Sequence, residues 1–171
     1  MIQLAWLIPV FPLVGFLITS LGGKKMPKSV SGALASLMVL ASFVVTIAIF
    51  TQFDGQPVTL DLFNWISSGT LAIPFSFMID QLSLIMLLII TGVGFLIHLY
   101  SIGYMHSDEA FTRFFSYLNL FIFFMLLLVM GSNYIVMFAG WEGVGLCSYL
   151  LIGFWFKNPE YNKAANKAFI M

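Results

Sequence analysis

Five long apolar segments, separated by short polar stretches, dominate the pattern of residues along this chain. Each is close to the ~20 residues that cross about 30 Å of hydrocarbon as a helix rising 1.5 Å per residue. We therefore predict five membrane spans, of which the first and fourth are at the short end of the usual range. The predicted spans cover residues 4–21, 30–50, 82–104, 114–130 and 134–156.

The segment between the second and third spans follows a different pattern. Residues 52–78 contain Gly, Pro, Asp, Ser and Asn, and Val58–Leu62 alternates between apolar and polar side chains. This pattern predicts a small β-hairpin with its turn region at Ile66–Thr70. Irregular backbone cannot face lipid, so we place the segment outside the membrane, with Phe63 and Trp65 at the level of the headgroups.

The basic residues predict the orientation of the chain. They follow the first, third and fifth spans, and none follows the second or fourth. With five spans, all seven lie on one side, which the positive-inside rule makes the cytoplasmic side, or the matrix side in a mitochondrial relative. We expect a bacterial inner-membrane protein with its N-terminus outside. The basic residues are Lys24, Lys25, Lys28, Arg113, Lys157, Lys163 and Lys167.

The composition supports a membrane fold. Hydrophobic residues make up 61% of the 171 and charged residues 8%, and the mean hydropathy is +1.03. Soluble domains carry about 25% charged residues, so the lipid bilayer is the solvent that fits. The formal net charge of zero gives no sign of a nucleic-acid partner. The predicted fold class is all-α: a polytopic transmembrane helix bundle with five spans, the start of a sixth, and a short extramembrane hairpin.

No pattern for a cofactor or a metal is present in the sequence. The one cysteine, Cys147, lies inside an apolar run, and no Cys and His cluster has the spacing of a metal site. No glycine-rich phosphate loop follows a strand. The first residues lack the basic region of a signal peptide, so we expect the first span to be retained.

The last residues predict a further helix. Lys163–Met171 looks like the opening of a sixth span, and we expect a truncated chain. We divide the sequence into residues 1–51 (two spans), 52–80 (external loop or hairpin), 81–131 (two spans) and 132–171 (the fifth helix and the start of the sixth).

One acidic residue, Glu142, lies inside a predicted span. It is eight residues from Tyr134 and fourteen from Phe156, so it lies roughly 12 Å and 21 Å from the two span ends. An ionised carboxylate there costs several kcal/mol or more unless it is paired or hydrated. A carboxyl group that alternates between a protonated state and an ion-paired state, as its partner moves, takes up and releases a proton. The alternative is a permanently protonated carboxyl that joins helices by a hydrogen bond. Small residues around Glu142, such as Gly143, predict a close approach of another helix.

Four other polar residues are candidates for weaker roles. His98, in the third span, is either a proton relay or a packing histidine. Lys167 either approaches the proton path of Glu142 or extends to the headgroups. Tyr149 shares a helix face with Glu142 and either bonds toward it or packs. Asp80 precedes the third span, where we expect it to cap the helix.

The fifth span resembles a known family closely over a long motif, Phe138–Trp155, which reads Phe-Ala-Gly-Trp-Glu-Gly-Val-Gly-Leu-Cys-Ser-Tyr-Leu-Leu-Ile-Gly-Phe-Trp. The motif is similar to the glutamate-bearing helix of subunit L (chain 5 in mitochondria) of NADH:quinone oxidoreductase, respiratory complex I. Phe77–Ser83, His98–Met105, Arg113–Phe121 and Lys167–Ile170 also look like the N-terminal region of that family.

The resemblance implies a proton-translocating subunit of a respiratory electron-transport enzyme. The family has about three times as many spans, including two inverted five-helix repeats, and the glutamate that corresponds to Glu142 pairs with a lysine on the seventh helix. NADH, FMN, iron–sulfur clusters and quinone belong to other subunits, so we expect no cofactor and no redox chemistry in this chain. The implied partners are other membrane-arm subunits, especially neighbouring antiporter-like ones, and the lipid bilayer.

Two alternatives stay open at this point. One is the large subunit of a multisubunit cation/proton antiporter, which shares the fold and the mid-membrane glutamate. The other is a non-pumping structural subunit of a membrane complex. The sequence does not choose between H⁺ and Na⁺ as the ion.

Overall fold

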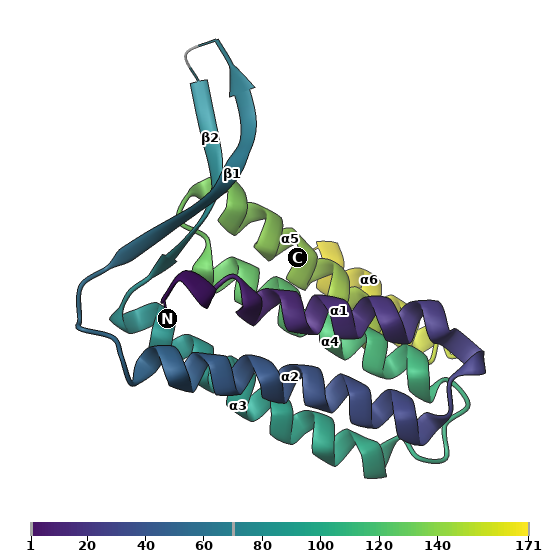
Figure 1. Cartoon of the computed structure of the whole chain (residues 1–171). Coiled ribbons are helices and arrows are strands. Elements are labelled where there is room, and N and C mark those ends of the chain that lie inside the picture. The colour runs from purple at the N-terminus through teal and green to yellow at the C-terminus, as the bar shows by residue number, and fades with distance from the viewer. Residues whose placement is uncertain (1, 70, 171) are drawn as a thin grey trace.

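The computed structural model describes residues 2–69 and 71–170, with the backbone alone for Lys24 and Leu71 (Figure 1). Within this part of the chain, five helices are long and apolar enough to cross a membrane. The predicted helical fold class is therefore confirmed. The helices are α1 (Leu7–Gly22, preceded by a short 3-10 turn at Ile2–Leu4), α2 (Lys28–Phe50), α3 (Gln81–Tyr104), α4 (Phe111–Met130) and α5 (Tyr134–Ile152), followed by the shorter α6 (Pro159–Ile170).

Helix α4 lies at the centre of the arrangement. It packs against α1, α2 and α3 on one side and against α5 on the other, and α6 packs on α5 (Figure 1). The first four helices thus form a bundle, to which α5 and α6 are added as an outer pair. This central place of α4 separates the two polar regions described below.

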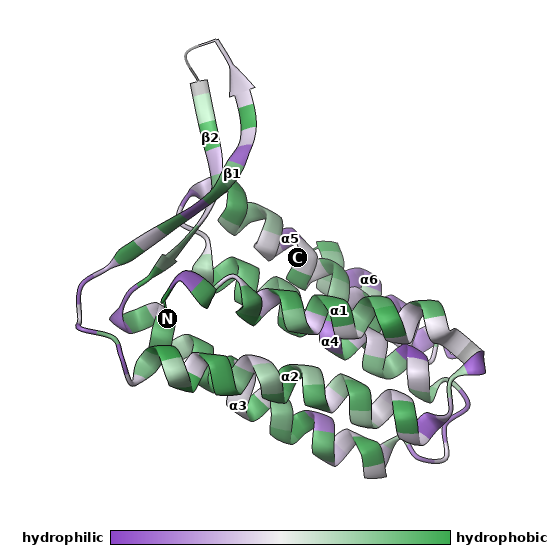
Figure 2. Ribbon diagram, in the orientation of Figure 1, coloured by the Kyte–Doolittle hydropathy of each residue, from purple (hydrophilic) through white to green (hydrophobic). Residues whose placement is uncertain are grey.

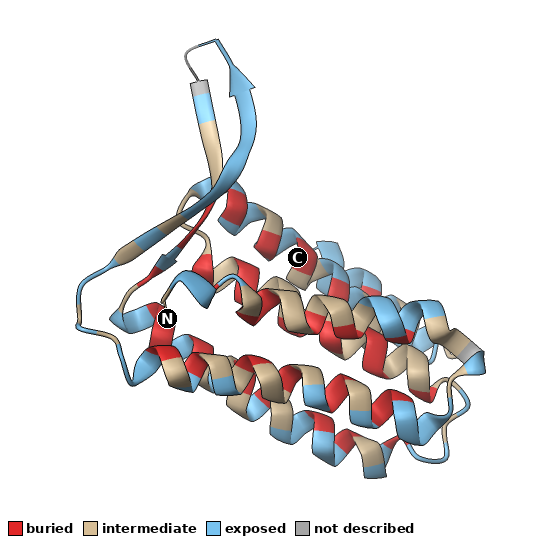
Figure 3. Cartoon of the chain, in the orientation of Figure 1, coloured by how far each residue is buried: buried red, intermediate tan, exposed pale blue. Residues whose placement is uncertain are grey.

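The surface of the bundle is apolar, as lipid contact requires. Leu82, Leu96 and Tyr100 are 69%, 61% and 70% exposed on α3 alone, and green apolar positions lie all around the helices in Figure 2. The buried positions form stripes along the contact faces (Figure 3). Such a distribution suits hydrocarbon, where apolar side chains need not be hidden.

Small hydroxyl side chains fill many of the helix contacts. Ser36, Thr46 and Thr91 each donate a hydrogen bond to the carbonyl four residues earlier, at 2.6–2.8 Å. Ser42 instead donates to the carbonyl of Ile8 at 2.8 Å and joins α2 to α1. These bonds satisfy polar groups that could find no partner in lipid.

The predicted hairpin is present and projects from one end of the bundle, here named the hairpin end (Figure 1). Its antiparallel strands are β1 (Val58–Ser68) and β2 (Leu71–Ile79), with two irregularities in register. The turn uses Gly69 at φ +58°, a conformation that costs glycine little. Ile66–Ser68, predicted in the turn, are part of β1, and Thr70 lies outside the described residues.

The hairpin is joined to the α4–α5 turn. Asn133 donates from Nδ2 to the carbonyl of Pro74 at 2.8 Å, and the Ser132 amide donates to the carbonyl of Ser76 at 3.1 Å. Phe77 also forms an isolated bridge with Gly131. The base of the hairpin is therefore held to the two helices that lead to and from this turn.

The basic turns meet at the opposite end, here named the lysine end, which comprises residues 23–27, 105–110 and 153–158. Lys28 donates from Nζ to the carbonyl of His106 at 3.1 Å. Arg113 donates from Nη2 to the carbonyl of Phe154 at 3.3 Å. The clustering of these turns on one side of the bundle, predicted from the lysine pattern, is confirmed. Lys163 and Lys167 lie farther along α6.

Three span boundaries differ from the prediction by three or four residues, and the first is the start of α1 at Leu7 and not at residue 4. Helix α4 begins at Phe111 and not at residue 114, whereas α5 ends at Ile152 and not at residue 156. At the end of α5, Phe154 is buried against Phe114, with ring centroids 5.3 Å apart. An apolar run that turns back into the protein has the same hydropathy as a helix, so hydropathy alone misplaced this boundary.

Candidate functional site

Helix α5 carries the candidate site and is well defined at both ends. The Asn133 side chain accepts hydrogen bonds from the amides of Ile135 and Val136 at 3.1 and 3.0 Å, which caps the first turn. The helix stops at Gly153, whose amide bonds the carbonyl of Tyr149 at 3.0 Å. The sequence therefore sets the length of α5 through its flanking residues.

One face of α5 is built from small residues and fits closely against α4. A Cβ atom at Gly143 would lie 2.1 Å from the Phe124 ring, and one at Gly140 would lie 2.5 Å from the backbone nitrogen of Leu128. Both glycines are buried. The predicted close approach of another helix at Gly143 is present, and the helix is α4.

Glu142 lies on the other face of α5, where it is exposed among apolar side chains. Phe138 and Trp141 precede it at 61% and 66% exposure, and Leu146 follows at 42%. Glu142 is eight residues from Tyr134 and ten from Ile152, so it lies roughly 12 Å and 15 Å from the two helix ends. This set of side chains is here named the glutamate face.

The glutamate face combines a carboxyl group with a depth at which lipid offers no hydrogen bonds. Among the described residues, the Glu142 carboxyl has no hydrogen-bonding partner. An isolated ionised carboxylate at this depth costs several kcal/mol or more, whereas a protonated carboxyl or a paired one costs far less. The arrangement is therefore suited to a group that exchanges a proton when a cation approaches or leaves.

Tyr149 and Lys167 lie nearer the lysine end than Glu142 does. The Tyr149 ring packs against Phe169 of α6, with centroids 5.6 Å apart. A Cβ at Gly153 would meet Ala165 at 3.1 Å, so α6 runs antiparallel to α5. Measured along the axis of α5, Lys167 of α6 is therefore about nine residues, or roughly 13 Å, closer to the lysine end than Glu142. The structure places both residues on the Glu142 side of α4 without bringing them into contact with the carboxyl.

His98 lies on the opposite side of α4. It is 1% exposed in α3, its Nδ1 is 2.8 Å from the carbonyl of Gly94, and its ring packs edge-on against Phe115 at 5.9 Å. Phe115 and Phe124 are nine residues apart on α4. Nine residues make two and a half helical turns, so the two side chains lie on opposite faces of α4. His98 and the Gly143 face of α5 therefore contact opposite faces of α4, and Glu142 lies on the far side of α5. A role for His98 in the same proton path stays a prediction.

Asp80 occupies the position expected of a helix cap. Its Oδ1 accepts from the Ser83 amide at 2.7 Å, and the Ser83 hydroxyl accepts from the Asp80 amide at 2.8 Å. The backbone and side-chain bonds with Ser83 hold the pKa of Asp80 below its usual value. This reciprocal capping box fixes the start of α3 at the hairpin end.

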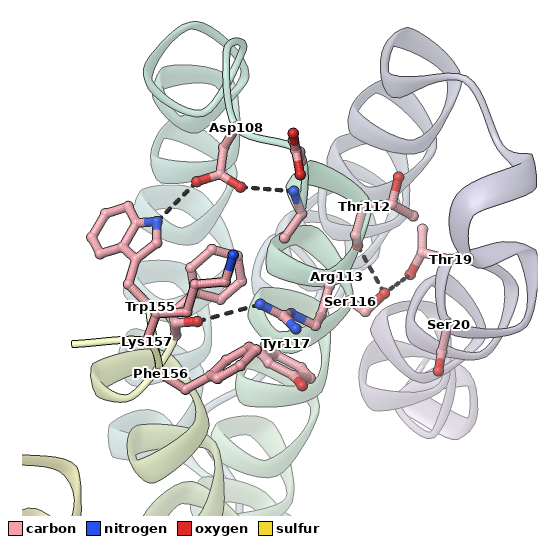
Figure 4. Close-up of a pocket in the computed structure, with 14 residues that line it drawn as sticks. Thr19, Ser20, Asp108, Thr112, Arg113, Ser116, Tyr117, Trp155, Phe156 and Lys157 are labelled. Atoms are coloured by element: carbon pink, nitrogen blue, oxygen red, sulfur yellow. Dashed lines mark hydrogen bonds between the residues drawn. The ribbon is translucent and has the colours of Figure 1, made fainter. Parts of the chain in front are cut away.

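A pocket at the lysine end was not predicted from the sequence. It has a volume of about 670 Å³ and lies between α1, α4 and the turn after α5 (Figure 4). Its floor includes Thr19 and Ser116, and its rim combines acidic, basic and aromatic groups. The rim residues include Asp108, Glu109, Arg113, Tyr117, Phe154, Trp155 and Lys157.

Asp108 and Arg113 organise the rim of this pocket. Asp108 accepts from the indole nitrogen of Trp155 at 2.8 Å and from the amide of Ala110 at 2.7 Å. The Trp155 bond is the main cause that holds the pKa of Asp108 below its usual value. The Arg113 guanidinium lies 4.8 Å from the centroid of the Phe154 ring. No signal in the sequence pairs positions 108 and 155, because the contact depends on how α5 ends.

Among the described residues, no three His, Cys, Asp or Glu side chains lie together as a metal site would require. The part of the chain that the structure describes therefore offers no set of ligands from which a metal centre could be built.

Comparison with known proteins identifies the family. Residues 65–115 match a family model described as the chain 5 N-terminus of NADH-ubiquinone oxidoreductase (complex I), and residues 131–171 match a transmembrane model described as NADH:quinone oxidoreductase/Mrp antiporter. The chain is also similar in fold to a chain from the membrane-bound sulfane sulfur reductase, an archaeal respiratory membrane complex. That match has a TM-score of 0.83 and 19% identity, over 98% of this chain and 34% of the other.

The curated relatives agree with the family models. NADH-quinone oxidoreductase subunit L of Mycobacterium tuberculosis is 45% identical over 97% of this chain and 27% of its own length. Subunit L of Escherichia coli is 42% identical over 95% of this chain and 27% of its own length. NADH-ubiquinone oxidoreductase chain 5 of Hypocrea jecorina is 39% identical over 95% and 24%. This chain spans about a quarter of the length of these relatives, and it belongs to the subunit L (chain 5) family of NADH:quinone oxidoreductase.

Proposed function

We propose that this chain is part of a proton-translocating membrane-arm subunit of an NADH:quinone oxidoreductase, and that Glu142 is its proton-carrying group. The observation that carries the proposal is a carboxyl roughly 12 Å from the nearer end of a spanning helix, on an exposed apolar face. Membership of the subunit L family and the antiporter description of the matching model support it.

The glutamate face needs a partner that neutralises or pairs with the carboxyl. We infer that the rest of the full-length protein covers this face and brings a cationic side chain to Glu142. While the cation is near, the carboxylate stays ionised; when the cation moves away, the protonated form is favoured. Breaking a buried ion pair costs about 3–5 kcal/mol. Moving a proton against about 100 mV costs roughly 2.3 kcal/mol, so a change in pairing is large enough to drive it.

The proposal assigns the chemistry of the complex to different subunits. This chain moves protons, whereas NADH oxidation, FMN, iron–sulfur clusters and quinone reduction belong to other subunits. Its partners are then the other membrane-arm subunits, especially neighbouring antiporter-like ones. The β1 side chains Leu62, Phe63 and Ile66, which are 40–56% exposed, supply an apolar surface outside the bundle for such a contact.

We place the protein in a bacterial inner membrane, with the lysine end on the cytoplasmic side. Lys25 and Lys157 lie in the turns at that end and Lys28 begins α2 there, whereas the α4–α5 turn at the hairpin end has no basic residue among its described positions. The positive-inside rule then puts the hairpin and the N-terminus on the outer side.

The test is proton pumping by the assembled complex that carries Glu142→Gln in the full-length protein. Glutamine keeps the shape and hydrogen bonding of the side chain but cannot ionise. We expect NADH-driven acidification of inverted vesicles to fall several-fold while the complex still assembles. Glu160→Gln is the matched control, because Glu160 is exposed in the first turn of α6, and it leaves pumping unchanged. Normal pumping by Glu142→Gln would show that the glutamate is structural, as expected of a non-pumping scaffold subunit.

A multisubunit cation/proton antiporter is the second candidate. It is favoured by one observation, the Mrp antiporter named in the description of the family model that matches residues 131–171. In that case vesicles exchange Na⁺ for H⁺ without NADH, and Glu142→Gln abolishes the exchange. NADH-dependent pumping that is independent of Na⁺ excludes it.

A further inference from the structure

Asn119 is a buried amide whose polar atoms have no partner in the protein. It lies in α4, nine residues into the helix, and is 0% exposed. Neither its Oδ1 nor its Nδ2 has a hydrogen-bond partner among the described residues. Native structures leave few buried polar groups unsatisfied, because such a group loses its hydrogen bonds to water without replacement.

The Asn119 side chain packs against a position on α1 that has no side chain. Gly15 of α1 faces it, and a Cβ atom at this position would lie 3.1 Å from Nδ2 and 3.2 Å from Oδ1. The side chain therefore extends to the backbone of α1 at a point where any other residue would crowd it. The amide has donors and an acceptor to offer here, and water is the small ligand that can pair with both.

A pair of hydroxyl groups lies between the level of Asn119 and the pocket at the lysine end. Ser116, one turn below Asn119 on α4, donates to Oγ1 of Thr19 at 2.9 Å. Thr19, one turn below Gly15 on α1, donates to the Gly15 carbonyl at 2.7 Å. Both Thr19 and Ser116 line the pocket (Figure 4). The floor of the pocket and the Asn119 amide are therefore one helical turn apart.

We propose that this pocket is a water-filled vestibule that continues past the Thr19–Ser116 pair to a water-binding site at Asn119. Hydroxyl groups rotate, so this pair exchanges its mutual bond for bonds to water without a change in the backbone. The vestibule reaches eight residues into α4 from Phe111, or roughly 12 Å. It lies on the α1 side of α4, whereas the glutamate face lies beyond α5.

The proposal concerns α1, α4 and the turn after α5, and it does not depend on the role of Glu142. Water that enters the lysine end here would stop at Ile122, which is 6% exposed one turn above Asn119 and belongs to the apolar core. The vestibule is thus open at the lysine end and closed at its inner end. Water reaches Asn119 from the lysine end and not from the hairpin end.

Cysteine accessibility in the full-length protein tests the vestibule. Single substitutions Ser116→Cys, Asn119→Cys and Ile122→Cys are made in a Cys147→Ala background, and the assembled complex is treated in inverted vesicles with a small, charged methanethiosulfonate. Retained NADH:quinone turnover shows that each variant is assembled. We expect Asn119→Cys to react within about tenfold of the rate of Ser116→Cys, and Ile122→Cys to react at least about a hundredfold more slowly, because thiols react as thiolates in contact with water.

Reaction of Asn119→Cys as slow as that of Ile122→Cys overturns the proposal. A second measurement covers the case in which Asn119→Cys fails to assemble. In the unsubstituted complex, a density map that resolves water must show a molecule within about 3 Å of the Asn119 side chain. Ordered water in the pocket with none at Asn119 overturns the proposal, and water at both places supports it.

Discussion

The indole nitrogen of Trp155 donates a hydrogen bond of 2.8 Å to the Asp108 carboxylate and joins two turns whose residues are 47 positions apart in the chain. The bond connects the turn before α4 to the turn after α5. It thereby closes one side of the pocket at the lysine end. Trp155 lies beyond the end of α5 at Ile152, where its indole reaches Asp108.

Trp155→Phe removes this donor and keeps an aromatic ring. We expect a loss of stability of at most about 1 kcal/mol at pH 7, because the bond is partly exposed. The folded-state pKa of Asp108 lies below the ordinary 3.8, so the stabilisation is present above that value and is lost as the pH falls through the folded-state pKa. Thermal unfolding of the purified full-length protein at pH 7 and near pH 3 measures it.

The difference between wild type and Trp155→Phe should shrink at the lower pH. Trp6→Phe is the control, since Trp6 is exposed at the other end of the bundle, and its effect should not change with pH. A difference that grows on acidification would contradict the assignment of the pKa shift to this bond.

Gly143→Ala tests the contact between α4 and α5. The added Cβ would lie 2.1 Å from the Phe124 ring, so we expect a destabilisation of about 1–3 kcal/mol or poor assembly of the complex. Gly145→Ala is the matched control on the same helix, because its Cβ meets no described atom within 4 Å. The yield of assembled complex and its thermal stability are the measurements.

The double variant Gly143→Ala, Phe124→Leu should recover part of the loss, since leucine leaves the space that the new methyl needs. Equal effects of alanine at positions 143 and 145 would mean that helix propensity, and not packing, governs both sites.

Asp80→Ala should weaken the start of α3. Loss of an N-cap costs about 0.5–2 kcal/mol, and here the Ser83 hydroxyl also loses the orientation that the capping box gives it. Because the pKa of Asp80 is lowered, the wild-type advantage persists above pH 3.8 and falls as the pH drops through the folded-state pKa. Thermal unfolding measures the loss, with exposed Asp61→Ala as the comparison. An Asp80→Ala variant as stable as Asp61→Ala would exclude the cap as a source of stability.

His98→Leu should change proton pumping little. His98 packs on Phe115, on the face of α4 away from α5, and its Nε2 has no hydrogen-bond partner among the described residues. Leucine removes one bond to the Gly94 carbonyl, so we expect a stability cost of about 1 kcal/mol. Pumping per NADH oxidised, measured beside Glu142→Gln, separates the two roles. A loss as large as that of Glu142→Gln would make His98 part of the proton path.

Hydropathy and local signals predicted much of the fold. The ends of α2 and α3 follow from the apolar runs, the hairpin from the turn residues and alternation around Val58–Leu62, and the cap from Asp80. The depth of Glu142 also follows from its position in the run. In each case the cause is local along the chain.

The rest depended on contacts between distant segments. Hydropathy extended α5 to residue 156 because Phe154 and Trp155 are apolar, although they turn back onto α4 and Asp108. The exposure of Glu142 depends on which face of α5 meets α4. The glycines indicate which face of α5 packs against another helix, but they do not identify that helix as α4. The pocket at the lysine end combines α1, α4 and the turn after α5, so no single stretch of sequence contains it.

The close fit of Gly143 to Phe124 restricts movement of α5 relative to α4. Asn133 at one end and the Arg113–Phe154 contact at the other bind α5 and its flanking turns to their neighbours. Sliding or rotation of α5 past α4 would drive a ring into backbone. We therefore expect α4 and α5 to move as one unit, so that two states of the full-length protein, superposed on these helices, differ in the segments that face the Glu142 carboxyl.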